Sequence, residues 1–170
     1  MIKVIHLVRD PRAILNSRKN GNWKSRLQDT EYVCNNLLDD LQLSTLLPSE
    51  RYFFLFDAKF YVDQFNISLV FRYKLVRYED VVADPLEMMK DLYTFSGIPF
   101  SKEVETNILQ RTHAEAANKN SKNYYGTTRS KDFDPNHWKQ EMKNNRILEI
   151  EDACKDFLDS MNYPSFFVKK

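Results

Sequence analysis

Arg9 and Ser17, eight positions apart, are the side chains that most clearly indicate a binding site in this sequence. A guanidinium offers paired N–H donors to a phosphate, and a serine hydroxyl offers one more. Asp10 is a good N-cap, and Pro11 fits the first position of a helix because its missing N–H would have no intrahelical partner there. Ser17 then lies two turns into that helix on the side that carries Asp10, so we expect Arg9 and Ser17 to converge on one phosphate.

A strand over residues 2–8 must position Arg9. This segment, IKVIHLV, is an apolar run interrupted by Lys3 and His6, a pattern typical of a parallel strand covered on both faces. In open α/β sheets, ligands bind where the strands end, and the start of the following helix favours an anion through its free amides and partial positive charge. The sequence therefore predicts a strand–turn–helix unit with an anion site at its turn.

Three further elements are predicted along the chain. Residues 73–78 alternate in the pattern of a strand that ends before Glu79, after which Asp84 caps a helix that starts at Pro85 and stops at Gly97. Residues 22–47 are predicted to form one helix. A last helix is predicted over residues 138–161, with an apolar stripe made of Trp138, Met142, Ile147, Ile150, Cys154, Leu158 and Met161.

The segment HLVRDPRAILNSR, residues 6–18, resembles the 3′-phosphate-binding segment of sulfotransferases that use 3′-phosphoadenylyl sulfate, and most of all that of the Golgi carbohydrate sulfotransferases. The resemblance implies that Arg9 and Ser17 hold the 3′-phosphate of the nucleotide. The cradle that it implies comprises Arg9, Asp10, Pro11, Arg12, Ala13, Ile14, Leu15, Asn16 and Ser17. The alternative is a capped core helix with scattered surface arginines.

Two later segments are similar to the same family. RYED at 77–80, followed by DPL at 84–86, implies that Tyr78 lies near the adenine, with a hydrogen-bonded core tyrosine as the alternative. YGTTRSKDFDPNHW at 125–138 resembles a late loop that folds over the nucleotide. By that resemblance, Arg129 and Ser130 are further phosphate donors, and the alternative is an ordinary polar loop.

Other polar residues do not indicate acid–base or metal chemistry. Glu79 and Asp80 are adjacent, and neighbouring residues on a strand point to opposite faces, so we expect them to be turn and strand-positioning groups. His6, His113 and His137 show no metal-ligand spacing, so no zinc site is expected. We expect His6 to be a core residue of its strand.

Composition favours one α/β domain over residues 1–170 and excludes several classes. With 42% hydrophobic residues and no low-complexity segment, neither disorder nor a repeat array is indicated. The net charge is +1, yet residues 1–28 hold seven Lys or Arg against one acidic residue, which places a positive field around the phosphate site. These charged residues are interleaved with the apolar residues of a strand. A nucleic-acid-binding arm would be polar throughout, so no nucleic-acid partner is expected.

Apolar stretches, cysteines and glycosylation sequons in the sequence indicate the cellular compartment of the protein. No stretch of 18 apolar residues is present, so we expect no membrane anchor in this chain. The resemblance implies the Golgi lumen, with a type II membrane anchor in the full-length protein. Cys34 and Cys154 are too few for a disulfide framework, and their pairing is left open. Asn66, Ile67 and Ser68 form an N-glycosylation sequon, which has meaning only in the secretory pathway.

Two departures from the family pattern stand out. Sulfotransferases bind the 5′-phosphosulfate with a P-loop-like segment upstream of the 3′-phosphate segment, and the proposed base usually also lies upstream. The three glycines, Gly21, Gly97 and Gly126, form no such loop, so we interpret the chain as the C-terminal part of a sulfotransferase domain. Residues 53–71 hold half of the twelve phenylalanines, and we hypothesise an insertion, with a genuine aromatic-rich helix as the alternative.

The expected fold is a three-layer α/β architecture with a mainly parallel sheet flanked by helices, resembling the sulfotransferase members of the P-loop kinase-like fold. The expected reaction transfers a sulfuryl group from 3′-phosphoadenylyl sulfate to a carbohydrate hydroxyl on a glycan, without a metal and with the catalytic residues unassigned. We expect this chain alone not to transfer sulfate. The alternative is a noncatalytic nucleotide-binding or inactive sulfotransferase fragment; a related kinase would need GxxxxGK[ST], which is absent.

Overall fold

The computed structural model describes residues 2–21, 23, 25–45, 71–112, 128–130 and 132–167. In chain order these form β1 (Ile2–Val8), α1 (Pro11–Asn20), a 3-10 helix (Ser25–Gln28), α2 (Thr30–Thr45), β2 (Phe71–Arg77), α4 (Tyr78–Ala83), α5 (Pro85–Ser96), α6 (Lys102–Thr112), α7 (Trp138–Glu141), α8 (Asn144–Ala153) and α9 (Lys155–Ser160). β1 and β2 pair in parallel, from Ile2 opposite Phe71 to Val8 opposite Arg77. The predicted α/β class with parallel strands is therefore confirmed.

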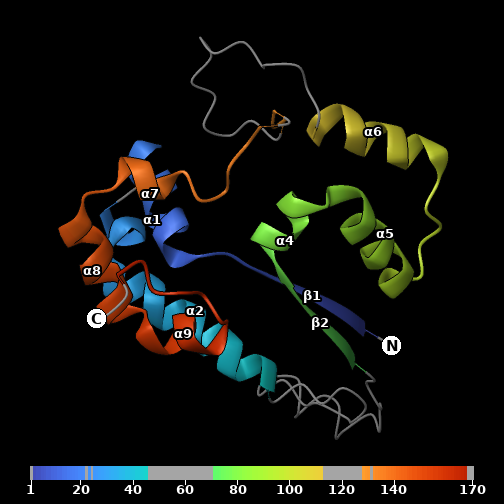
Figure 1. The fold of residues 1–170 in the computed structure, drawn as a ribbon. Helices are drawn as coiled ribbons and strands as arrows, with labels where there is room; N and C mark the ends of the chain where they lie inside the picture. The colour runs from blue at the N-terminus through green and yellow to red at the C-terminus, as the bar shows by residue number, and fades with distance from the viewer. Residues whose placement is uncertain are drawn as a thin grey trace, which may run out of the picture.

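The elements fall into two groups that β1 joins (Figure 1). One group contains β1, β2, α4, α5 and α6, and the other contains α1, α2, α7, α8 and α9. α5 lies against the sheet, where Asp91 forms a 2.6 Å ion pair with Lys74 of β2 and the ring of Phe95 lies 5.7 Å from the same ammonium. Among the described residues the sheet has two strands, so the full three-layer arrangement stays a prediction.

The helix starts that were predicted from capping residues are confirmed. The carboxylate of Asp10 accepts a hydrogen bond from the N–H of Arg12, and that of Asp84 accepts one from the N–H of Glu87. Each aspartate thus satisfies an N–H that has no partner within its helix, and a proline follows each at the first helical position. Gly97 ends α5 with φ of 75°, a left-handed conformation that glycine adopts without steric cost.

Three boundaries differ from the sequence prediction. The helix predicted over 22–47 is replaced by the 3-10 turn and by α2, because the side chain of Asp29 accepts a hydrogen bond from the N–H of Tyr32 and starts a new helix there. The strand predicted to reach Tyr78 ends at Arg77, and Tyr78 opens α4. The last helix is three short helices, because Met142 is extended and Cys154 is not helical. Asn144 and Asn145, which favour caps over helix interiors, follow the first break.

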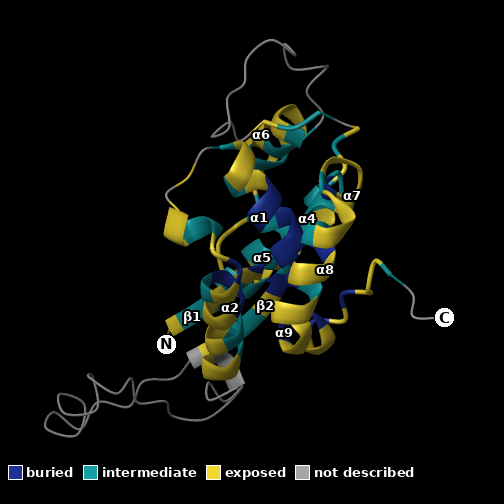
Figure 2. Ribbon diagram, turned by 90° about the vertical axis from the view of Figure 1, so that its left-hand side faces the viewer, coloured by how far each residue is buried: buried dark blue, intermediate teal, exposed yellow. Residues whose placement is uncertain are grey.

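The core lies in the second group of elements (Figure 2). The predicted apolar stripe is buried there: Trp138, Ile147 and Ile150 are fully buried, and Phe157 joins them. A disulfide between Cys34 and Cys154 ties α2 to the bend between α8 and α9. The pairing that the sequence left open is thus decided by the fold.

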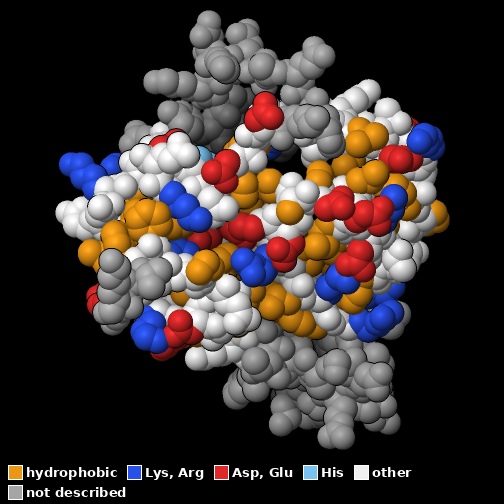
Figure 3. Space-filling view, in the orientation of Figure 1, with side chains coloured by type: hydrophobic (Ala, Val, Ile, Leu, Met, Phe, Trp, Pro, Cys, Tyr) orange, Lys and Arg blue, Asp and Glu red, His pale blue; other side chains and the backbone are white. Residues whose placement is uncertain are grey.

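The strands contribute less to this core. Val8 is buried, whereas Ile2, Ile5 and Leu7 of β1 are 42%, 42% and 57% exposed. Figure 3 shows hydrophobic side chains open to solvent between charged ones across this face of the molecule. Of the hypothesised insertion 53–71, residues 53–70 lie outside the described residues and Phe71 opens β2.

Candidate functional site

The turn between β1 and α1 holds Arg9 at the carboxyl end of the sheet. The Arg9 guanidinium lies 4.5 Å above the ring of Tyr78, the first residue of α4. Its Nε is buried and has no hydrogen-bond partner among the described residues. Arg9 directly follows β1, and Tyr78 directly follows β2. Because the two strands pair in parallel, their carboxyl ends lie side by side, which brings Arg9 and Tyr78 together. Arg9 thus carries a fixed positive charge beside the start of α1.

Glu79 holds the same turn through its carboxylate. Its Oε1 accepts a hydrogen bond from the N–H of Asp10 at 3.1 Å, and its Oε2 accepts one from the hydroxyl of Tyr163 at 2.7 Å. Burial, and then the hydrogen bond to Glu79, raises the pKa of Tyr163 far above its usual value. Glu79 contacts other protein groups on both sides, as expected of a positioning residue, although it does so from a helix rather than a strand.

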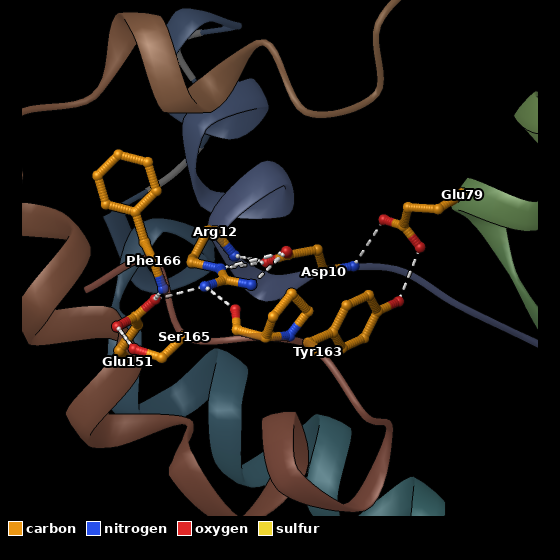
Figure 4. Close-up of polar contacts among 8 residues, drawn as sticks. Asp10, Arg12, Glu79, Glu151, Tyr163, Ser165 and Phe166 are labelled. Carbon is orange, nitrogen blue, oxygen red and sulfur yellow. Dashed lines mark hydrogen bonds and ion pairs between the residues drawn. The ribbon is translucent and has the colours of Figure 1, made fainter. Parts of the chain in front are cut away.

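Arg12 organises the inner side of the turn (Figure 4). It is 2% exposed and pairs with Asp10 at 2.8 Å and with Glu151 of α8. Its Nη1 also donates to the carbonyl of Pro164 at 3.0 Å, and its guanidinium lies 4.5 Å from the ring of Trp138. Burial alone would lower the pKa of Arg12, but the hydrogen bonds and charges of the two carboxylates raise it, so Arg12 stays charged.

Comparison with known proteins agrees with this arrangement of motifs. The family model described as "Sulfotransferase domain" matches residues 1–162. The chain belongs to the sulfotransferase family. Its relatives include carbohydrate sulfotransferases, and no solved structure matches significantly.

Three of these sulfotransferases illustrate the similarity. Carbohydrate sulfotransferase 3 of Mus musculus is 32% identical over 169 residues, which cover 95% of this chain and 34% of the relative. Carbohydrate sulfotransferase 1 of Rattus norvegicus is 30% identical, with 95% and 39% covered, and carbohydrate sulfotransferase 5 of Mus musculus is 27% identical, with 96% and 42% covered. The chain therefore spans about two fifths of these relatives or less.

Within the segment from Arg9 to Ser17, which was predicted to form a phosphate cradle, burial separates accessible side chains from inaccessible ones. Ser17 is exposed on α1 and Arg9 is half-buried. Ala13 and Leu15 are buried in the core, and the Asn16 amide donates to Glu141 at 2.6 Å. Pro11 and Arg12 are buried and Ile14 packs against the core. The side chains of Arg9 and Ser17 are therefore more accessible than those of Pro11, Arg12, Ala13 and Leu15, and their contact with a phosphate stays a prediction.

Arg129 and Ser130 precede α7, and Arg129 contacts the end of α6. The N–H of Arg129 donates to the carbonyl of Arg111 near the end of α6 at 2.8 Å, and its guanidinium lies 5.2 Å from the ring of Phe133. A contribution of Arg129 and Ser130 to phosphate binding stays a prediction.

Sequence reasoning missed the residues that brace the turn from the C-terminal side. Tyr163 and Glu151 carry no recognisable motif of their own; they lie in the short segments MNY at 161–163 and IEDAC at 150–154. His6 is half-buried in β1, and its Nδ1 lies 2.7 Å from the Tyr73 hydroxyl. In the described part of the chain no group of His, Cys, Asp and Glu could hold a metal ion, and no described helix is long and apolar enough to cross a membrane.

Proposed function

We propose that the turn at Arg9 binds the 3′-phosphate of 3′-phosphoadenylyl sulfate, and that the protein transfers the sulfuryl group of this donor to a carbohydrate hydroxyl. Family membership and the names of the relatives support the reaction class. One observation carries the site: the Arg9 guanidinium lies at the start of α1 over Tyr78 with a buried, unpartnered Nε. An anion placed there would gain charged hydrogen bonds and the field of the helix start.

Ser17 and Tyr78 complete the proposed donor site. Ser17 supplies an exposed hydroxyl on α1, and the ring of Tyr78 is the proposed neighbour of the adenine. Arg9 and Ser17 anchor the donor and do not take part in bond changes. They would fix the nucleotide so that its far end is presented in one orientation, which is the positional part of catalysis.

The proposed reaction is a direct sulfuryl transfer that involves no metal ion. The acceptor oxygen forms a bond to sulfur while the bond between sulfur and the bridging phosphate oxygen breaks. The acceptor proton passes to a base that we do not assign, and adenosine 3′,5′-bisphosphate leaves. Charge builds on the bridging oxygen, so donors around the 5′-phosphosulfate supply much of the rate. These 170 residues contain no Gly-rich phosphate loop, so we propose that alone they bind the nucleotide without turnover.

The proposed compartment is the Golgi lumen. The disulfide between Cys34 and Cys154 supports an oxidising compartment, since disulfides form and persist in the secretory pathway and are rare in the cytosol. The sequon at Asn66 fits the same pathway. A full-length protein would reach it as a membrane-anchored enzyme that acts on glycans.

Calorimetric titration of the purified chain tests the donor site. Arg9→Ala should weaken binding of adenosine 3′,5′-bisphosphate by roughly ten- to a hundredfold, because charged hydrogen bonds are lost. Arg26→Ala is the matched control, since Arg26 also lies over a tyrosine, 4.4 Å from the ring of Tyr32, but outside the turn. Binding that is indifferent to Arg9, or equally weakened for 5′-AMP, would contradict the proposal. Transfer of labelled sulfate by the chain alone would contradict the lack of turnover.

A further inference from the structure

Glu79 and Tyr163 connect the turn at Arg9 to the C-terminal segment. We infer that Glu79 and Tyr163 are positioning residues of the donor site, which set the orientation of Arg9 and thereby the preference for a nucleotide with a 3′-phosphate. This inference rests on the proposed function. It adds a role for two residues that do not themselves contact the donor.

A backbone hydrogen bond at the turn holds the peptide that follows Arg9. The N–H of Asp10 belongs to the peptide that joins Arg9 to Asp10, and it donates to Glu79 Oε1 at 3.1 Å. This peptide direction sets where the Arg9 side chain leaves the backbone. The neighbour of Glu79, Tyr78, lies under the Arg9 guanidinium, so the first turn of α4 holds both the backbone and the side chain of Arg9.

Glu79 is itself held in place by Tyr163. Its other oxygen accepts from the Tyr163 hydroxyl at 2.7 Å, and Tyr163 is 6% exposed. The Tyr163 ring packs between the guanidinium of Arg77, 4.3 Å away, and the ring of Phe157, 6.3 Å away. Figure 4 shows Glu79 between Asp10 and Tyr163. The carboxylate is therefore held at both oxygens, one toward the turn and one toward the core.

The C-terminal segment that carries Tyr163 is anchored by Arg12 and Glu151. The residue after Tyr163, Pro164, offers its carbonyl to Arg12 at 3.0 Å, and the N–H of Phe166 donates to Glu151 at 2.6 Å. These contacts tie the residues that follow Tyr163 to Arg12 and Glu151. A guanidinium held in this way loses little freedom on binding a phosphate, and preorganisation of this kind increases affinity.

The consequence is a selective effect on nucleotide binding. Without the Glu79 carboxylate, the Asp10 N–H loses its acceptor, and Arg9 can turn away from the position in which it meets the phosphate. The adenosine part of the nucleotide does not depend on this contact. Affinity for adenosine 3′,5′-bisphosphate should fall roughly 2- to 30-fold in Glu79→Ala, the range for residues that act through a contacting partner, while affinity for 5′-AMP stays the same.

The test measures the affinity for both nucleotides by calorimetric titration of the unmodified chain and of four variants. Glu79→Gln should keep most of the preference, because its amide oxygen still accepts from the Asp10 N–H and its amide N–H can donate to the Tyr163 hydroxyl. Glu87→Ala is the control, since Glu87 pairs with Lys90 on the exposed side of α5. Circular dichroism checks folding. If Glu79→Ala does not fold, Tyr163→Phe, which removes only the hydroxyl, decides the question by the same ratio of affinities.

Each outcome has one meaning. A lost preference in Glu79→Ala with rescue in Glu79→Gln supports the inference. A preference retained in Glu79→Ala, or equal weakening for both nucleotides, overturns the inference and leaves the donor site standing. Equal binding of both nucleotides by the unmodified chain overturns the donor site and the inference together.

Discussion

The helices around α1 and the helices beside the strands differ in how deeply they are buried. α1, α8 and α9 each place residues in the core, and the disulfide joins α2 to the end of α8. α4, α5 and α6 contain no buried residue, and β1 leaves Ile5 and Leu7 open to solvent. Hydrophobic burial is the main source of stability, so among the described residues most of the stabilisation comes from the helices around α1.

The turn at Arg9 lies where these two regions meet. Val8 before it is buried, and Arg12 after it pairs with Glu151 from the core region. From the strand side, Tyr78 and Glu79 of α4 reach the turn. The comparison indicates that the proposed site takes its rigidity from one region and part of its binding contacts from the other. Substitutions in the two regions should therefore separate stability from binding.

The largest expected effect on stability is that of Arg12→Met. Loss of the guanidinium leaves the buried Asp10 and the half-buried Glu151 without their cationic partner, which should lower the free energy of unfolding by about 3–5 kcal/mol. Urea denaturation followed by circular dichroism measures the change. Arg146→Met removes an exposed pair with Glu149 and should cost about 0–1 kcal/mol. Equal effects of the two variants would contradict a buried network at the turn.

Loss of the disulfide should come next. Cys34 and Cys154 are 120 residues apart, and their link restricts the unfolded chain, so the double variant Cys34→Ala, Cys154→Ala should lose about 2–5 kcal/mol. The same unfolding experiment with reductant should bring the unmodified chain to the level of the variant. A denaturation midpoint that does not respond to reductant would show that the two cysteines are not paired.

A matched pair of leucines tests the difference in burial directly. Leu158→Ala in α9 should cost about 2–5 kcal/mol, because Leu158 is 5% exposed and its removal leaves a cavity. Leu109→Ala in α6 should change stability by about 0.5 kcal/mol or less, because Leu109 is 38% exposed. Urea denaturation of both variants gives the comparison. A cost at Leu109 that matches the cost at Leu158 would mean that α6 packs as firmly as α9.

Among the substitutions of buried groups, Tyr163→Phe should have the smallest effect, about 1.5–3 kcal/mol at neutral pH for a hydrogen bond to a charged group. The pKa of Tyr163 is raised in the folded state, so the folded protein keeps the proton while the unfolded chain releases it above its ordinary value of 10.0. This stabilisation is complete below that pH and declines as pH rises. The difference between the unmodified chain and Tyr163→Phe should shrink from about pH 9 to about pH 11.

Tyr32→Phe on α2 is the control for this pH series. It removes a tyrosine hydroxyl from outside the turn, so its difference from the unmodified chain should not change in the same way. A constant difference for Tyr163→Phe across the series would contradict the buried hydrogen bond to Glu79.

The helix starts and the order of strand, turn and helix were determined by the sequence alone. Asp10 with Pro11, and Asp84 with Pro85 and Gly97, act on backbone groups within three residues, so their effect does not depend on the rest of the fold. The position of Arg9 at the end of a strand follows from the same local signals. The family resemblance of these segments could be recognised for the same reason.

Only the tertiary structure decided which distant groups meet. Glu79 and Tyr163 are 84 residues apart, Arg12 and Glu151 are 139 apart, and the two cysteines are 120 apart. No local pattern specifies such contacts, because each requires several elements to pack together first. The breaks at Met142 and Cys154 belong with them: an apolar stripe of helical spacing predicts which residues are buried, but packing of the segment against α1 and α2 decides where the helix is interrupted.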